Sequence, residues 1–136
     1  MESFPGMKLS HLTSVLSKTK PTNTGFNPKA IILSVGINDR ANTPGTARIN
    51  ADKAIRAAQV RFPNSKIYFA QIHVSNILNK TEQNILNSLN EHLNNKYPDL
   101  VLNKLPPQSF ATDRLGVHWT DDCANEIISH WISQVN

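Results

Sequence analysis

Cysteine is almost absent from this sequence. The single cysteine, Cys123, excludes an internal disulfide bond and any zinc site built from several cysteine ligands. A chain without a disulfide framework is typical of a reducing compartment. We therefore expect an intracellular protein, cytoplasmic or nuclear.

Long apolar runs are also missing. No stretch approaches the roughly 20 apolar residues that a membrane-spanning helix needs. Residues 1–6 do not resemble a secretory signal peptide. We expect no transmembrane segment and a soluble protein, unless a targeting segment precedes Met1.

The positive charge is not gathered into one segment. The formal net charge is +4 and the sequence pI is about 9.4, which allows weak, nonspecific attraction to nucleic acid or anionic surfaces. Lys and Arg are spread along the whole chain, without a basic arm and without the interleaved aromatic residues of a stacking platform. The composition therefore supports a nucleic-acid partner only weakly.

The apolar content is that of a folded protein. Hydrophobic residues make up 39% of the 136 positions, which is enough for one domain over residues 1–136 with a buried core. Apolar runs and helical spacing predict a helix over 8–17, a strand over 30–35, a helix over 43–62, a strand over 66–72, a helix over 81–97, a strand over 100–102 and a final helix capped by Thr120. This alternation predicts an α/β fold with a parallel sheet and helices on both faces.

The residues after the first strand form a candidate site, because open α/β sheets bind ligands beyond the carboxyl ends of their strands. Gly36 permits a sharp turn there, and the side-chain amide of Asn38 can donate a hydrogen bond to a developing oxyanion. The alternative is that Gly-x-Asn-Asp is turn chemistry without a functional role.

A second candidate cluster, residues 113–120, precedes the final helix and contains His118, which is placed to act as a general base. Taken in isolation, a single histidine in a loop is usually a surface residue. His73, after the second strand, can line the same rim, but the pair lacks a third ligand, so we expect no metal and no cofactor. The histidines at 11, 92 and 130 fall in helices, where we expect surface residues.

Three segments together resemble the sequence blocks of the SGNH (GDSL-like) hydrolases. They are Phe4-Pro5-Gly6 before a helix, Gly36-Ile37-Asn38-Asp39, and Gly116-Val117-His118-Trp119 before a helix. The resemblance implies a three-layer α/β/α sandwich with a flavodoxin-like parallel sheet, and hydrolysis of an ester by a serine nucleophile. It also implies roles for single residues: His118 as the base, and Gly6 and Asn38 in the oxyanion hole. By their place after the first strand, Gly36 and Asp39 are expected at the substrate rim, and Trp119 either borders this rim or packs the final helix onto the sheet.

The blocks are particularly similar to those of the esterase-like domains of vertebrate non-LTR retrotransposons. This narrower resemblance implies a retrotransposon-derived protein with an ester or lipid substrate and an association with RNA or membranes.

Two departures from the family pattern bear on activity. The Gly-Asp-Ser block that carries the nucleophile is absent from the 136 residues, and the acid three residues before the histidine is replaced by Leu115. Asp113, five residues before His118, reaches the imidazole only if the loop bulges. We therefore expect an impaired enzyme with little or no esterase activity; the alternative is a noncatalytic binding or assembly module that engages RNA, lipid or another chain.

The absence of the first block also has a structural consequence. In the family, two further strands precede the strand at 30–35 and make it an interior strand of the sheet. Without them the sheet is reduced to about three strands, and the strand at 30–35 has an unpaired edge. We expect this edge to support a homodimer, aggregation or a partner chain.

Overall fold

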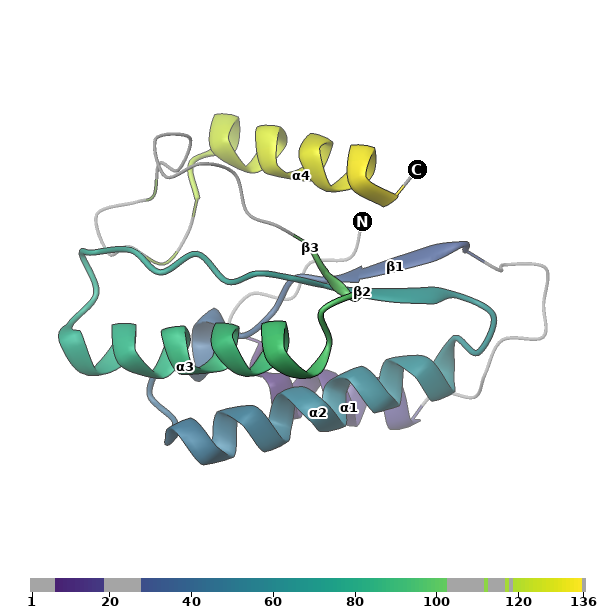
Figure 1. Ribbon diagram of the computed structural model, residues 1–136, viewed down its shortest axis with the longest axis horizontal. Coiled ribbons are helices and arrows are strands. Elements are labelled where there is room, and N and C mark those ends of the chain that lie inside the picture. The colour runs from purple at the N-terminus through teal and green to yellow at the C-terminus, as the bar shows by residue number, and fades with distance from the viewer. Residues whose placement is uncertain (1–6, 19–27, 103–111, 113–116, 118, 136) are drawn as a thin grey trace.

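The computed structural model describes residues 7–18, 28–102, 112, 117 and 119–135, and Figure 1 shows their arrangement. Helices and strands alternate along the chain as the sequence predicts. In order they are α1 (Leu9–Lys18), β1 (Ala30–Leu33), the 3-10 helix η1 (Ile37–Asp39), α2 (Pro44–Arg61), β2 (Lys66–Ala70), α3 (Lys80–Lys96), β3 (Val101–Leu102) and α4 (Asp121–Val135).

The three strands form one parallel sheet in the order β1-β2-β3. Ile31 lies opposite Ile67 in the first pair, and Phe69 lies opposite Val101 in the second. Within the described part of the chain, β1 pairs with β2 alone and is therefore an edge strand. The predicted parallel α/β sheet is confirmed, in the form of a truncated flavodoxin-like sandwich.

Helices cover both faces of this sheet, as expected. Successive side chains of a strand point to opposite faces, so Phe69 packs into the core formed with α1, α2 and α3, and Ala70 packs against α4. In Figure 1 the three helices of the larger core lie below the sheet and α4 lies above it. The larger core holds most of the fully buried side chains, including Leu9, Ile55 and Leu89.

Side-chain caps fix where the helices begin. The hydroxyl of Thr43 accepts a hydrogen bond from the Thr46 N–H at 3.3 Å, with Pro44 in the first turn of α2, as predicted. The Thr120 hydroxyl accepts from the Cys123 N–H at 3.4 Å at the start of α4. The predicted start of α3 at Thr81 is wrong, because Asn79 and Glu82 form a reciprocal capping box that begins the helix at Lys80.

Candidate functional site

A cavity of about 170 Å³ opens at the carboxyl ends of β1 and β2. Its walls come from the ends of the two strands and from the segment before α4. We call it the rim cavity; it is lined by Ser34, Val35, Ile37, Ala70, Gln71, Ile72, His73, Val117 and Trp119. It lies where an open α/β sheet is expected to bind a ligand.

Segments about 80 residues apart in the sequence meet at this cavity. Val35 and Ile37 belong to the turn after β1, and Val117 and Trp119 are the described neighbours of position 118 on either side. Trp119 also forms an isolated antiparallel bridge with Thr112 and packs against Trp131 of α4, with ring centroids 5.8 Å apart. His118, Asp113 and Gly6 lie outside the described residues, so their predicted roles stay predictions.

Gly36 is required by the geometry of the turn. Its φ is +121°, in a region that residues with a Cβ rarely adopt. A Cβ at this position would lie 2.6 Å from Cδ1 of Ile72, which is a wall residue of the rim cavity. The glycine therefore lets the chain turn tightly against the end of β2.

The Asn38 side chain ties this turn to the segment before α1. Its amide Nδ2 donates a hydrogen bond to the Met7 carbonyl at 3.1 Å, and Arg40 donates to its Oδ1 at 3.4 Å. An amide nitrogen carries two hydrogens, so one contact to Met7 leaves the second hydrogen for a ligand. Asn38 adjoins the rim cavity through Ile37 and is not itself among its wall residues.

Asp39 lies beneath the rim rather than on it. Its side chain is fully buried, and its two carboxylate oxygens accept from the Leu9 N–H and from Nδ2 of Asn42, each at 2.9 Å. Burial raises the pKa of this carboxyl above its usual value, although both hydrogen bonds act in the opposite direction. Because Leu9 is the first residue of α1, Asp39 satisfies an N–H that the helix itself leaves unpaired. We assign it a positioning role between η1 and α1.

The wall of the rim cavity that Ile72 forms is held by a residue that the sequence analysis did not single out. Asn90 of α3 is buried and forms two hydrogen bonds with the backbone of Ile72, accepting from its N–H at 2.9 Å and donating to its carbonyl at 2.8 Å. These bonds satisfy the backbone just beyond the last residue of β2. The available signal was an amide within the apolar face formed by Ile85, Leu86, Leu89 and Leu93.

The wall also contains polar side chains. His73 lines the cavity, as its position after β2 predicted, together with Ser34 and Gln71, which the sequence analysis did not single out. Ser34 is exposed and directly follows β1. Among the described residues no group of three potential ligands could hold a metal ion. The walls therefore combine aliphatic and aromatic surface with a few hydrogen-bonding groups.

His92, expected to be a surface residue, is half-buried at the edge of a surface groove between α2 and α3. Its Nε2 lies 2.8 Å from Oδ1 of Asp52, and only 20% of its side chain is exposed. The sequence could not reveal this contact because the two residues are 40 positions apart and meet only where α2 packs on α3.

The chain matches no protein-family model and no curated protein sequence. The resemblance to SGNH hydrolases therefore depends on the sequence blocks alone.

Proposed function

We propose that this chain is an SGNH-type ester hydrolase domain in which the rim cavity binds the substrate and the chemistry is impaired. The observation that supports the proposal is the shared wall: the turn after β1 and the residues flanking position 118 line one cavity. The two sequence blocks of the resemblance thus contribute to one place. An oxyanion hole and a general base act on the same reacting group, so the segments that carry them must lie close together.

In this proposal the residues have separate tasks. His118 takes a proton from the attacking group, Asn38 and Gly6 donate hydrogen bonds to the oxyanion, and Asp113 is a weak orienting acid. The aliphatic wall formed by Val35, Ile37 and Ile72 receives the hydrocarbon part of a short ester. Trp119 borders the opening.

The missing nucleophile sets the expected activity. An enzyme of this type attacks the ester carbonyl with a serine oxygen, and the 136 residues contain no Gly-Asp-Ser block. A triad without its nucleophile retains only the roughly 10³- to 10⁴-fold acceleration over water that its oxyanion hole and binding energy supply. We therefore expect ester binding with very slow turnover.

An assay with a short-chain nitrophenyl ester tests this proposal. The wild-type chain should turn over the ester with at most the residual acceleration over the buffer blank that an oxyanion hole supplies, and His118→Ala should change that rate little. His130→Ala, in α4, is the matched control. Rapid turnover that His118→Ala abolishes and His130→Ala preserves would show a working catalytic site and contradict the impairment.

A second candidate function, an assembly module, is favoured by one observation. In the described part of the chain β1 pairs on one side only, and unpaired strand edges bind other strands. We propose that this edge pairs with a second copy or a partner chain. Multi-angle light scattering should then show dimers or larger species, whereas a stable, monodisperse monomer at high concentration counts against it.

A further inference from the structure

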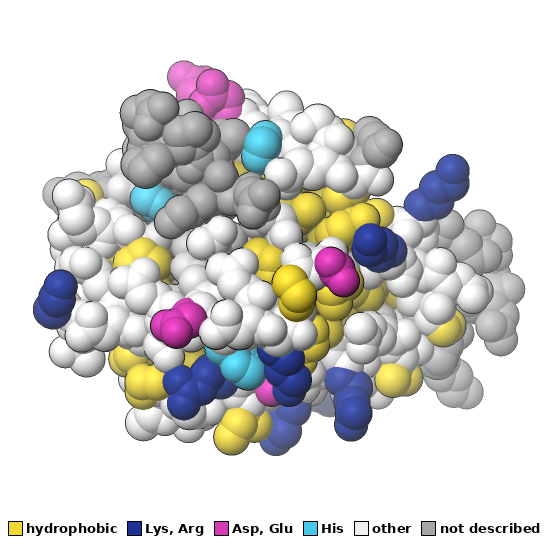
Figure 2. All heavy atoms as spheres, in the orientation of Figure 1, with side chains coloured by type: hydrophobic (Ala, Val, Ile, Leu, Met, Phe, Trp, Pro, Cys, Tyr) yellow, Lys and Arg dark blue, Asp and Glu magenta, His cyan; other side chains and the backbone are white. Residues whose placement is uncertain are grey.

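The outward face of α2 combines exposed aliphatic side chains with cations. Ile49 and Val60 are 57% and 64% exposed, and the exposed side chains of Lys53 and Arg56 lie between them. The spacing of four, three and four residues places all four on one helical face. We call these four residues the α2 stripe; it contains no carboxylate. Figure 2 shows cationic and hydrophobic side chains gathered along the lower edge of the molecule, where Figure 1 shows α2.

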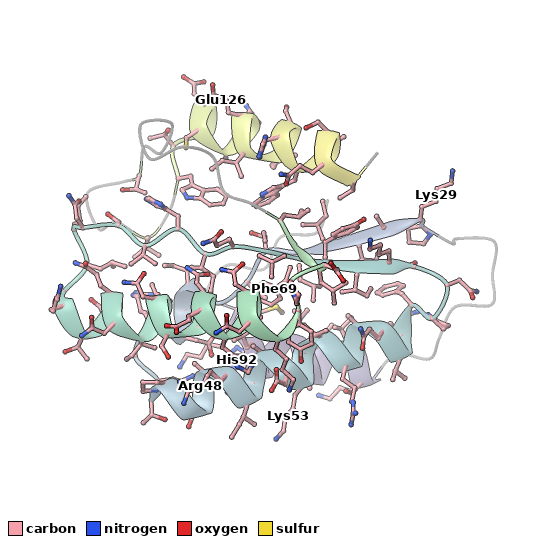
Figure 3. The ribbon with its side chains drawn as sticks, in the orientation of Figure 1. Lys29, Arg48, Lys53, Phe69, His92 and Glu126 are labelled. Atoms are coloured by element: carbon pink, nitrogen blue, oxygen red, sulfur yellow. The ribbon has the colours of Figure 1, made fainter. Side chains whose placement is uncertain are left out.

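A groove between α2 and α3 adjoins the stripe and contains further hydrogen-bond donors. It is lined by Arg48, Ser88, Glu91, His92, Asn95 and Lys96 and measures about 420 Å³. The Arg48 guanidinium donates to the Ser88 hydroxyl at 2.8 Å, which fixes its direction and leaves its other N–H groups for a ligand. In Figure 3, Arg48 and Lys53 lie on α2 at the lower edge, and His92 lies between α2 and α3.

The carboxylates near the groove offset its two cations, so the excess positive charge of this surface comes from the α2 stripe. Asp52 accepts hydrogen bonds from His92 at 2.8 Å, Lys96 at 2.9 Å and Tyr97 at 2.7 Å. Burial alone would raise the pKa of Asp52, but these hydrogen bonds outweigh burial and hold the pKa below its usual value. Asp52 is therefore ionised, and its charge together with that of Glu91 offsets Lys96 and Arg48. Lys53 and Arg56 of the α2 stripe remain as the excess cations.

We propose that the α2 stripe and the adjoining groove form a docking surface for an anionic lipid bilayer. Arg48, Lys53 and Arg56 would contact phosphate groups, and Ile49 and Val60 would enter the boundary between headgroups and acyl chains. At 1.5 Å per residue the two aliphatic side chains are about 16 Å apart along the axis, so α2 lies parallel to the surface. No described helix is long and apolar enough to cross a membrane, so the contact is peripheral.

The exposed aliphatic residues favour a lipid surface over nucleic acid. A phosphate backbone is bound by cations and hydrogen-bond donors, and single strands also stack on aromatic rings. The α2 stripe has no aromatic residue, and its two ends are β-branched aliphatic side chains. Cations flanked by inserting aliphatic groups are the pattern of an interfacial helix.

Co-flotation of the full chain with vesicles tests the docking surface. The chain should bind vesicles of phosphatidylcholine mixed with phosphatidylserine, should not bind phosphatidylcholine alone, and should lose binding as salt is added. Lys53→Glu should weaken binding at least about fivefold, because each cation near such a surface has an effect of that size. Ile49→Ser should weaken it by about as much.

Matched variants elsewhere on the surface are the controls. Lys29→Glu is the control for Lys53→Glu: it makes the same change in net charge, next to β1 and far from Lys53 in Figure 3. Ile132→Ser is the control for Ile49→Ser: it removes an exposed isoleucine from α4, on the other face of the sheet. All four positions are exposed, so the variants should melt like the wild type. Both control variants should bind the mixed vesicles as the wild type does.

Three outcomes would overturn the proposal. The first is absence of binding to mixed vesicles, or equal binding to neutral ones. The second is equal weakening by each test variant and its control. The third is a protein that ignores vesicles and binds a single-stranded oligoribonucleotide through Lys53, which would assign the surface to nucleic acid. None of these outcomes depends on ester binding at the rim cavity.

Discussion

Replacement of Asp39 tests whether the turn after β1 is held in place by α1. Asp39→Ala removes both acceptors of the buried carboxylate and leaves the Leu9 N–H and the Asn42 amide without their partner. Loss of a helix cap costs about 1 kcal/mol, and each buried donor left unpaired costs about 1 to 3 kcal/mol. We expect the free energy of unfolding to fall by about 2 to 4 kcal/mol, a large part of the stability of an ordinary domain.

The pH dependence of stability separates the charge of Asp39 from its hydrogen bonds. Burial raises the folded-state pKa of this carboxyl above the unfolded value, so the folded protein binds its proton more tightly. The stabilisation is complete below the unfolded pKa, near 3.8, and is lost as pH rises through the raised folded pKa. Asp39→Asn keeps an acceptor for Leu9 and has no proton to release, so it should lack this fall.

Urea unfolding at a series of pH values measures both effects. In the wild-type chain the free energy of unfolding should contain a contribution from Asp39 that declines with rising pH. The difference in free energy of unfolding between wild type and Asp39→Asn, taken at each pH, should isolate this contribution. The account of the turn would be refuted if Asp39→Ala unfolded within about 0.5 kcal/mol of wild type, the range of an ordinary surface change. It would also be refuted if the decline persisted unchanged in Asp39→Asn.

Three further substitutions, two of them with a control, test the walls of the rim cavity and the contact between α2 and α3. Gly36→Ala should destabilise the protein by about 2 to 4 kcal/mol in urea unfolding, because the new Cβ strains the backbone and overlaps the Ile72 side chain. Gly45→Ala is the control: its Cβ would have no other atom within 4 Å, and the change should stabilise the protein by up to about 1 kcal/mol. Asn90→Ala leaves the buried N–H and carbonyl of Ile72 unpaired and should lower the free energy of unfolding by about 2 to 4 kcal/mol. Asn94→Ala, at an exposed position of the same helix, should lower it by less than about 0.5 kcal/mol. Equal losses would show that the two hydrogen bonds of Asn90 do not stabilise the end of β2. The pKa of Asp52 is lowered in the folded protein, so this carboxylate stabilises the fold above its unfolded-state pKa, and the stabilisation is lost as pH falls through its folded-state pKa. Asp52→Asn should therefore reduce the fall of the melting temperature at acid pH. An unchanged fall would argue against the three hydrogen bonds of Asp52.

Periodicity was sufficient to predict the order of the elements and the parallel sheet, because these depend on local patterns of apolar residues. It overestimated the length of the strands. β1 ends at Leu33 and β2 at Ala70, although the apolar runs continue to Val35 and Ile72. Val35 and Ile72 are apolar because they pack on the core, and the backbone of Ile72 pairs with the Asn90 side chain instead of a neighbouring strand.

Long-range side-chain contacts explain what the sequence could not predict. The bonds of Asp39 to Leu9 and of Asn90 to Ile72 join residues 30 and 18 positions apart. No pattern in one segment encodes the position of its partner. The sequence placed Asp39 in the correct turn, but only its burial shows that it supports the rim from beneath.

The central claim is that the rim cavity is the place where an ester binds, and a methyl NMR titration tests it most directly. As methyl butyrate is added, the methyl signals of Ile37, Ile72 and Val117 and the indole N–H of Trp119 should shift together and saturate. The signals of Ile49 and Val60 on α2 should stay in place. Saturable shifts confined to α2 or α4, or none at the rim cavity, would contradict the account.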